Sequence, residues 1–209
     1  MKIHLANTLN LTANNIPLEK LSLRASEKFL RLKENSPKSA VNCAIGDLLL
    51  KHELNSRGIV APQILQNENG KPYFEGQPFE FNISHQENLV VLAVSDTPVG
   101  IDVQTLDDDK LKMATVLLNE LELSEFNALE NNEAQIKYLI KCFTQKEAYV
   151  KMLGEALPYP PSSIKSYEGA KFVTKYVFQD NKVYCLTVCS PEIKSLTFKV
   201  HNVFQLVRE

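Results

Sequence analysis

The chain has 209 residues, of which 44% are hydrophobic and 23% are charged, and its formal net charge at pH 7 is −2. These values are ordinary for a globular protein of one or two domains, and they exclude a global electrostatic attraction to nucleic acid or to an anionic membrane. The sequence begins without a basic segment followed by an apolar run, and it contains no long apolar segment. We therefore expect no signal peptide, no membrane span and a cytoplasmic location.

The cysteines favour a reducing compartment. The chain has four of them, Cys43, Cys142, Cys185 and Cys189, and none belongs to a CxxC motif or to a Cys/His cluster with zinc-ligand spacing. Cys142 and Cys185 lie among apolar residues. We expect buried free thiols rather than disulfides or a metal site.

The first hundred residues are expected to run from a strand through two helices into several strands. Residues 1–7 have the composition of a strand, and from Leu18 apolar residues recur at helical spacing as far as Leu32. A second helix is expected to begin at Ser36-Pro37, with the proline at its first position, and to end before Gly58. Extended segments are expected at residues 59–65, 70–74, 79–84, 88–95 and 99–104.

The second half repeats this order of elements without a repeat of residues. Helices are expected at 112–121, at 124–131 with Ser124 as the cap, and at 133–153, and strands at 170–178, 182–189 and 195–204. Because hairpin-length links join the strands, we expect mainly antiparallel sheets in an α+β fold. The expected division is an N-terminal half of residues 1–101 and a C-terminal half of residues 102–209.

The strand VGIDVQ (residues 99–104) carries a polar face. Gly100, Asp102 and Gln104 alternate with apolar residues, so they share one side of the strand. A carboxylate and an amide oxygen on one face could bind a cation, and Gly100 would let a ligand approach closely. The alternative is an edge strand with a solvated polar face.

The segment FTQKEAYVKMLGEAL (residues 143–157) places charges on a helix face that should be buried. On a helical wheel, Lys146 and Glu147 fall inside an apolar arc of about half the circumference, and Lys151 follows Glu147 by one turn. Asp102 and Glu147 together would supply the hard oxygen ligands that Mg²⁺ prefers. Lys146 either reaches solvent along its stem or meets an anion, and Glu147 with Lys151 could equally form a surface ion pair.

Other polar groups could meet phosphates. His85 ends the motif FNISH (residues 81–85), next to Ser84, and Lys71 lies in the turn GKP. The segment 20–38 has a local excess of four positive charges, because six lysines and arginines outnumber two glutamates. For each group the alternative is structural: a satisfied histidine, an exposed turn lysine and a solvated helix face. No glycine-rich nucleotide loop of the P-loop type is present.

The motifs GKP, FNISH, VGIDVQ and FTQKEAYVKMLGEAL, in this order and spacing, resemble the 4′-phosphopantetheinyl transferases of the surfactin-synthetase-activating type. The match covers about residues 70–157. The resemblance implies two pseudo-symmetric α+β halves with the active site between them. It also implies transfer of the phosphopantetheine arm of coenzyme A to a serine of an apo acyl or peptidyl carrier protein, with Mg²⁺ as cofactor and release of adenosine 3′,5′-bisphosphate.

The same resemblance implies roles for individual residues. Asp102, Gln104 and Glu147 would bind Mg²⁺, with Glu147 and Lys151 as catalytic residues and either Glu147 or a metal-bound water as the proton acceptor. The coenzyme A contacts would come from Lys28, Arg31, Lys71, Pro72, Ser84, His85, Lys146 and Lys151. Lys28 is the best match for the residue that binds the 3′-phosphate, and Arg24 and Arg31 are the alternatives.

The sequence departs from the family pattern at three positions. Gln104 replaces a frequent glutamate, Asn42 stands where an arginine is usual, and Phe143 replaces a tryptophan. The first two keep open a non-catalytic paralogue that binds coenzyme A or a carrier protein. An unrelated Mg²⁺-dependent phosphohydrolase is a further alternative. Because both halves lie in one chain, we expect a monomer.

Overall fold

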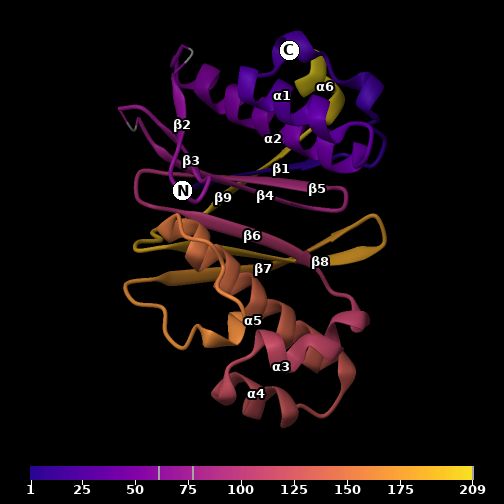
Figure 1. The fold of residues 1–209 in the computed structure, drawn as a ribbon, viewed down its shortest axis with the longest axis vertical. Coiled ribbons are helices and arrows are strands. Elements are labelled where there is room, and N and C mark those ends of the chain that lie inside the picture. Colours follow the sequence, from indigo (N-terminus) through magenta and orange to yellow (C-terminus); the bar gives the residue numbers. More distant parts are fainter. Residues whose placement is uncertain (61, 77, 209) are drawn as a thin grey trace.

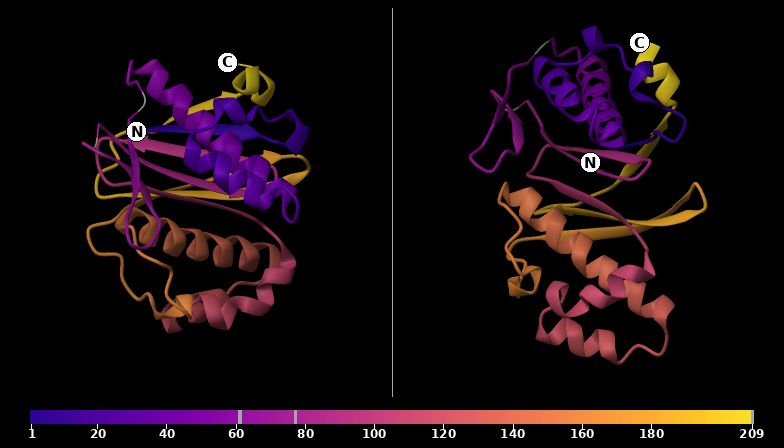
Figure 2. Two further views of the ribbon diagram at one scale, coloured as in Figure 1. Left: turned by 45° about the horizontal axis from the view of Figure 1, so that its top comes forward. Right: turned by 45° about the vertical axis from the view of Figure 1, so that its right-hand side comes forward.

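The computed structural model describes residues 1–60, 62–76 and 78–208, and its helices and sheets are arranged in four layers (Figure 1). Three helices lie over a four-stranded sheet, a three-stranded sheet packs beneath it, and further helices cover the opposite side. The two further views show the same order of layers (Figure 2). The two sheets therefore meet face to face in the centre of the molecule.

The first half follows the predicted order of elements. Strand β1 (Lys2–Asn7) is followed by helices α1 (Leu23–Leu32) and α2 (Pro37–Ser56). The hydroxyl of Ser22 caps α1, and α2 begins with a proline, whose missing N–H group costs nothing at that position. The strands that follow are β2 (Ile64–Gln66), β3 (Pro72–Phe74), β4 (Glu80–Gln86), β5 (Leu89–Ser95) and β6 (Gly100–Thr105).

The second half differs from the prediction at its first helices. The structure has a 3₁₀ segment, Asp108–Met113, then α3 (Ala114–Leu117), α4 (Glu120–Asn127) and α5 (Asn132–Leu153). The cap of α4 is Asn119 and not Ser124, because Asn119 and Glu122 each accept a hydrogen bond from the other's backbone N–H group. Strands β7 (Lys171–Gln179) and β8 (Lys182–Ser190) form the predicted hairpin.

The end of the chain returns to the first half. Strand β9 (Thr197–His201) pairs parallel to β1, and helix α6 (Val203–Arg208) places Val203 and Leu206 in the core beneath α2. The expected strand at 195–204 therefore ends earlier and turns into a helix. The division at residue 102 stays a prediction, but the last dozen residues pack with the N-terminal half.

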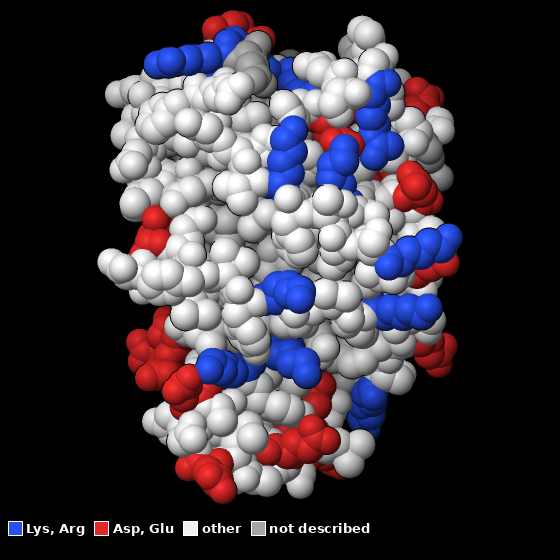
Figure 3. All heavy atoms as spheres, turned by 180° about the vertical axis from the view of Figure 1, so that it is seen from behind, with Lys and Arg blue, Asp and Glu red and all other residues white. Residues whose placement is uncertain are grey.

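The sheets confirm the α+β class with mainly antiparallel pairing. The strand orders are β4-β5-β1-β9 and β6-β8-β7, with β2-β3 as a separate hairpin, and in these sheets only the β1–β9 pair is parallel. Among the described residues, no helix has the length and apolarity that a membrane crossing requires. The face of the molecule in Figure 3 carries both basic and acidic side chains, so it presents no uninterrupted field of one sign.

The buried core between the sheets fixes which face of β6 is polar. Ile101 and Val103 of β6 pack with Leu186 and Val188 of β8 and with residues of β1 and β5. The other face of β6 therefore points to α5, as the alternation predicted. Gly100 serves this contact: a Cβ atom there would lie 1.9 Å from the carbonyl oxygen of Ala148 on α5. The close approach that Gly100 permits is that of a helix, and not that of a ligand.

Candidate functional site

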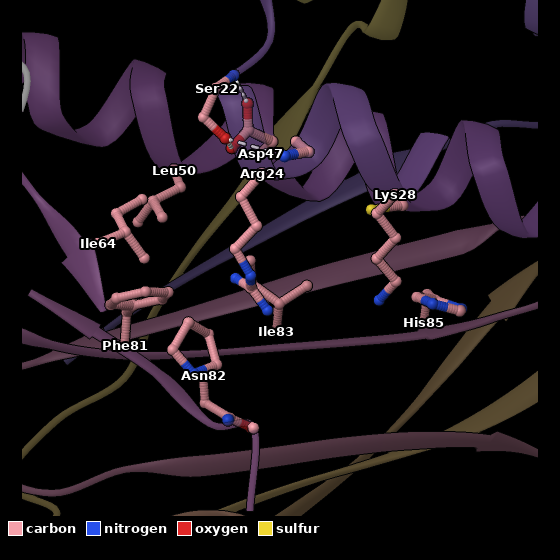
Figure 4. Close-up of a pocket in the computed structure, with 14 residues that line it drawn as sticks. Ser22, Arg24, Lys28, Asp47, Leu50, Ile64, Phe81, Asn82, Ile83 and His85 are labelled. Carbon is pink, nitrogen blue, oxygen red and sulfur yellow. Dashed lines mark hydrogen bonds between the residues drawn. The ribbon is translucent and has the colours of Figure 1, made fainter. Parts of the chain in front are cut away.

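A cavity of about 240 Å³ opens between α1, α2, the β2–β3 hairpin and β4 (Figure 4). Its walls combine basic, polar and apolar side chains, and its lining includes Ser22, Arg24, Lys28, Cys43, Asp47, Ile64, Gly70, Pro72, Asn82 and His85. A mixed lining of this kind suits a ligand that carries both an aromatic ring and phosphate groups.

Two basic side chains of α1 face this cavity. Figure 4 shows Arg24 and Lys28 extending from the helix toward β4, with the amine of Lys28 close to His85. Burial is the main cause that lowers the pKa of His85, and Lys28 and Lys151 lower it further. Arg31 is exposed and is not among the residues that line the cavity. The geometry therefore favours Lys28 and Arg24 over Arg31 as the basic groups of the cavity.

The wall behind these cations is held by polar contacts. Asp47 of α2 accepts hydrogen bonds from the backbone N–H and the hydroxyl of Ser22, at 2.8 Å and 2.6 Å. Asn42 does not line the cavity. Its side chain is buried, donates to the carbonyl of Glu87 and accepts from the hydroxyl of Thr8. Asn42 therefore stabilises the fold in this chain instead of presenting a basic group.

A second polar cluster lies around Asp102 on β6. The carboxylate is 2% exposed, and its Oδ1 accepts from Lys151 Nζ at 2.6 Å and from the hydroxyl of Ser84 at 2.9 Å. The ammonium of Lys151 also donates to Ser84, at 3.2 Å. The predicted residues Ser84, Asp102 and Lys151 are therefore brought together from three elements, and in this arrangement Ser84 contacts the carboxylate.

Glu147 belongs to the same cluster. Its pKa is raised, first by burial and then by the negative charge of Asp102, while Lys151 lowers it. Glu147 lies one helical turn before Lys151, which holds Asp102, so the two carboxylates face the same region and a cation between them would relieve their repulsion. His85 lines the cavity and directly follows Ser84 on β4, and the Ser84 hydroxyl donates to Asp102. The cavity and the carboxylate pair therefore adjoin at this point of β4.

Gln104 is held in one orientation by its neighbours. Lys110 Nζ donates to Gln104 Oε1 at 3.1 Å, and Gln104 Nε2 donates to Asp102 Oδ2 at 3.3 Å. Because a lysine can only donate and a carboxylate can only accept, the amide cannot be turned round in this network. Its oxygen is therefore already engaged, and Lys110, which no sequence motif identified, is part of the site.

Among the described residues, no group of three or more histidine, cysteine, aspartate or glutamate side chains forms a metal site. Asp102 and Glu147 remain as a pair of hard oxygen donors. Mg²⁺ typically takes one or two carboxylates and completes its shell with water and phosphate oxygens. The residues present therefore fit a Mg²⁺ site with two protein carboxylates.

Lys146 corrects one sequence prediction. Its side chain is fully buried, and its ammonium donates to the carbonyl of Leu117 and to Glu122 Oε2, each at 2.6 Å. The lysine does meet an anion, but this anion is Glu122 of α4. A phosphate contact for Lys146 is wrong in this geometry, because the ammonium points into the helical layer.

The neighbouring residues Lys71 and Pro72 face different parts of the molecule. Pro72 lines the cavity, as predicted. Lys71 instead directs its ammonium at the carbonyl of Met152, 2.8 Å away at the end of α5. Phe143 packs against the apolar core between α3, α4 and α5, so the change from tryptophan alters packing. All four cysteines are free, and three of them are buried.

Known proteins are similar to this chain over the segment that carries these side chains. A model of the 4′-phosphopantetheinyl transferase superfamily matches residues 98–190, which include Asp102, Glu147 and Lys151. The chain is 30% identical over 191 residues to the 4′-phosphopantetheinyl transferase gsp of Aneurinibacillus migulanus, a match that covers 90% of this chain and 76% of the relative.

Two further relatives are similar over shorter stretches. The 4′-phosphopantetheinyl transferase AcpT of Salmonella typhi is 34% identical over 140 residues, which are 65% of this chain and 71% of the relative. The 4′-phosphopantetheinyl transferase Sfp of Bacillus subtilis is 32% identical over 97 residues, which are 46% and 43% of the two chains. The long match to gsp and the shared motifs place this chain in the superfamily of 4′-phosphopantetheinyl transferases.

Proposed function

We propose that the protein transfers the 4′-phosphopantetheine arm of coenzyme A to a serine of an apo acyl or peptidyl carrier protein, in a Mg²⁺-dependent reaction that releases adenosine 3′,5′-bisphosphate. The observation that carries the proposal is the junction on β4, where His85 lines a basic cavity and the preceding Ser84 contacts the carboxylate pair. A nucleotide with a 3′-phosphate fits the first part, and a diphosphate with its cation fits the second.

The cavity would hold the nucleotide end of coenzyme A. Lys28 and Arg24 would bind the 3′-phosphate, because both extend from α1 into the cavity. Pro72 would pack against the nucleotide, and His85 would donate to a phosphate at the junction. The diphosphate would then lie toward Lys151, whose ammonium would exchange Asp102 for phosphate oxygens.

Asp102 and Glu147 would hold the Mg²⁺ ion. When bound, this ion would offset the charge that develops on the diphosphate oxygens. The amide of Gln104 would stay with Lys110 and Asp102 and would not be a ligand.

The remaining chemistry falls to Glu147 and Lys151. The serine oxygen of the carrier would attack the phosphorus next to the pantetheine, and the bond to the adenosine bisphosphate would break. Glu147 would accept the serine proton, because a carboxylate oxygen that does not bind the ion can accept a hydrogen bond from the serine hydroxyl. Lys151 would stabilise the negative charge on the departing bisphosphate.

Intact-protein mass spectrometry tests the proposal. Apo carrier proteins of fatty-acid, polyketide and nonribosomal-peptide synthesis are each incubated with the protein, coenzyme A and Mg²⁺. We expect the mass of one phosphopantetheine group on at least one carrier and an equal amount of released bisphosphate. No mass change on any of these carriers would contradict the proposal for those classes. Bisphosphate release without a carrier would indicate a phosphohydrolase.

The second candidate is a protein that binds coenzyme A or a carrier without transfer. Gln104 and Asn42 favour it, since they replace groups that are frequent in the family. In that case coenzyme A would bind and the carrier mass would stay unchanged. For either candidate we propose a monomer, because one chain supplies both sides of the site. We also propose a cytoplasmic location, because the four cysteines are free thiols.

A further inference from the structure

The turn between β2 and β3 reaches from the first half of the chain to the end of α5 (Figure 2). The side-chain amides of Asn67 and Asn69 donate to the carbonyl of Gly154, at 2.7 Å and 3.0 Å. Lys71 Nζ donates to the carbonyl of Met152 at 2.8 Å. These carbonyls end a helix, so they have no intrahelical partners and carry partial negative charge. The turn therefore caps α5 from outside the helix.

Hydrogen bonds within the turn hold its donor side chains in place. Asn67 Oδ1 accepts hydrogen bonds from the backbone N–H groups of Asn69 and Lys71, at 3.1 Å and 2.8 Å. The backbone N–H of Asn67 also donates a hydrogen bond to the carbonyl of Lys71. Gly154 lies in the left-handed region at φ 77°, and a Cβ atom there would be 2.7 Å from Asn67 Nδ2. The contact therefore depends on the conformation of the turn and on a glycine at position 154.

The same hairpin also forms one wall of the cavity. Gly70 and Pro72 line the cavity, while Lys71 between them points to α5. On α5, Lys151 lies only three residues before Gly154, and it holds Asp102. One short segment thus touches the nucleotide cavity with one face and the helix that carries Glu147 and Lys151 with the other.

We propose that the turn Asn67–Lys71 is a clamp that couples occupation of the nucleotide cavity to the position of the last turn of α5. Asn67, Asn69 and Lys71 are positioning residues in this proposal, because they act through α5 and touch no reacting atom. The proposal rests on the proposed function, since it takes coenzyme A as the occupant of the cavity. Its consequence is that a nucleotide bound against the hairpin steadies the last turn of α5 and, with it, Lys151.

Hydrogen–deuterium exchange with and without coenzyme A tests the clamp. The variants are Lys71→Met, which keeps the stem and removes the ammonium, and Asn69→Ala, which leaves the bonds within the turn intact. Gln66→Ala is the matched control, because Gln66 donates to Gly70 inside the hairpin and does not contact α5. Transfer is measured on the same samples as kcat and KM for coenzyme A.

In the unaltered protein we expect coenzyme A to slow exchange in both residues 81–85 and residues 150–154. In Lys71→Met and Asn69→Ala, the protection of 81–85 should remain and that of 150–154 should fall about tenfold, the effect of losing one hydrogen bond to a helix end. The kcat should fall by a similar factor, with little change in KM. Gln66→Ala should behave like the unaltered protein.

Three outcomes would overturn the clamp. The two variants could keep full protection of residues 150–154 and full kcat. Gln66→Ala could reproduce their effect, which would indicate a loss of hairpin stability rather than of coupling. Coenzyme A could protect residues 81–85 alone in the unaltered protein. If coenzyme A protects no segment of the unaltered protein, the proposed function itself fails, and this result is distinct from the other three.

Discussion

The amide of Gln104 lies between a lysine that can only donate and a carboxylate that can only accept. The sequence placed Gln104 on the face of Asp102, and this part is confirmed, because strand alternation is a local property. It could not predict that the oxygen is taken by Lys110. That lysine lies in an irregular 3₁₀ segment, where no periodicity indicates the direction of a side chain.

Gln104→Glu should strengthen the binding of Mg²⁺ in the absence of coenzyme A. The change adds a third carboxylate beside Asp102 and Glu147. One additional negative charge next to the ion is worth about 1 kcal/mol or more, or roughly a tenfold change in affinity. Isothermal titration calorimetry measures the affinity directly. Gln135→Glu adds the same charge twelve residues before Glu147 on α5, about 18 Å away, and should have little effect. Equal or weaker binding by Gln104→Glu would contradict this account of the cation site.

At the level of the elements, the helix predicted at 133–153 is α5 (Asn132–Leu153), because its apolar arc is a local pattern; in the structure Asn131 caps its start and Gly154 follows its end. It placed Lys146 on the buried face but not its partner. Glu122 lies on α4, twenty-four residues earlier, and a contact between two helices leaves no mark in the spacing of either one. For the same reason, the sequence did not predict that Gly100 packs against the backbone of α5.

Lys146→Met should destabilise the protein by about 3 kcal/mol, because it removes the positive charge paired with Glu122 and the hydrogen bond to the carbonyl of Leu117. Urea unfolding followed by circular dichroism measures this change. Lys137→Met is the control: it removes an exposed ion pair with Glu133 and should cost less than about 0.5 kcal/mol. Normal stability of Lys146→Met together with a raised KM for coenzyme A would restore the phosphate contact that the structure excludes.

At the scale of the whole molecule, the chain closes on itself through β9 and α6. His201 of β9 contacts the buried His4 of β1, with 2.8 Å between Nε2 and Nδ1. A pairing between strands at opposite ends of the chain leaves no local signal in the sequence. The sequence therefore predicted a strand near residue 197 but not its pairing with β1. It therefore assigned these residues to the C-terminal half.

Stability should fall in acid because of His4. Burial lowers its pKa to about 4, against the pull of Glu53, with Lys2, Lys199 and His52 lowering it further. A depressed pKa means that the stabilisation is complete above the ordinary value of about 6.5 and is lost as the pH falls from there to about 4, by about 3 kcal/mol in total.

Urea unfolding at a series of pH values tests this effect. His4→Gln should be less stable than the unaltered protein near pH 7, and its stability should change less between pH 6.5 and pH 4, since it lacks the titrating group. Parallel pH profiles of the two proteins would show that His4 does not carry the acid sensitivity.

We propose that the carboxylate pair between β6 and α5 is the centre of phosphopantetheine transfer. The most direct measurement is the intact mass of an accepted apo carrier after incubation with coenzyme A, Mg²⁺ and either Glu147→Gln or the control Glu155→Gln, which alters an exposed residue just beyond α5. We expect the carrier to stay unmodified with Glu147→Gln, although this variant keeps the thermal stability of the unaltered protein, and to be fully converted with Glu155→Gln. Conversion by Glu147→Gln at a rate near that of the unaltered protein would contradict the proposal.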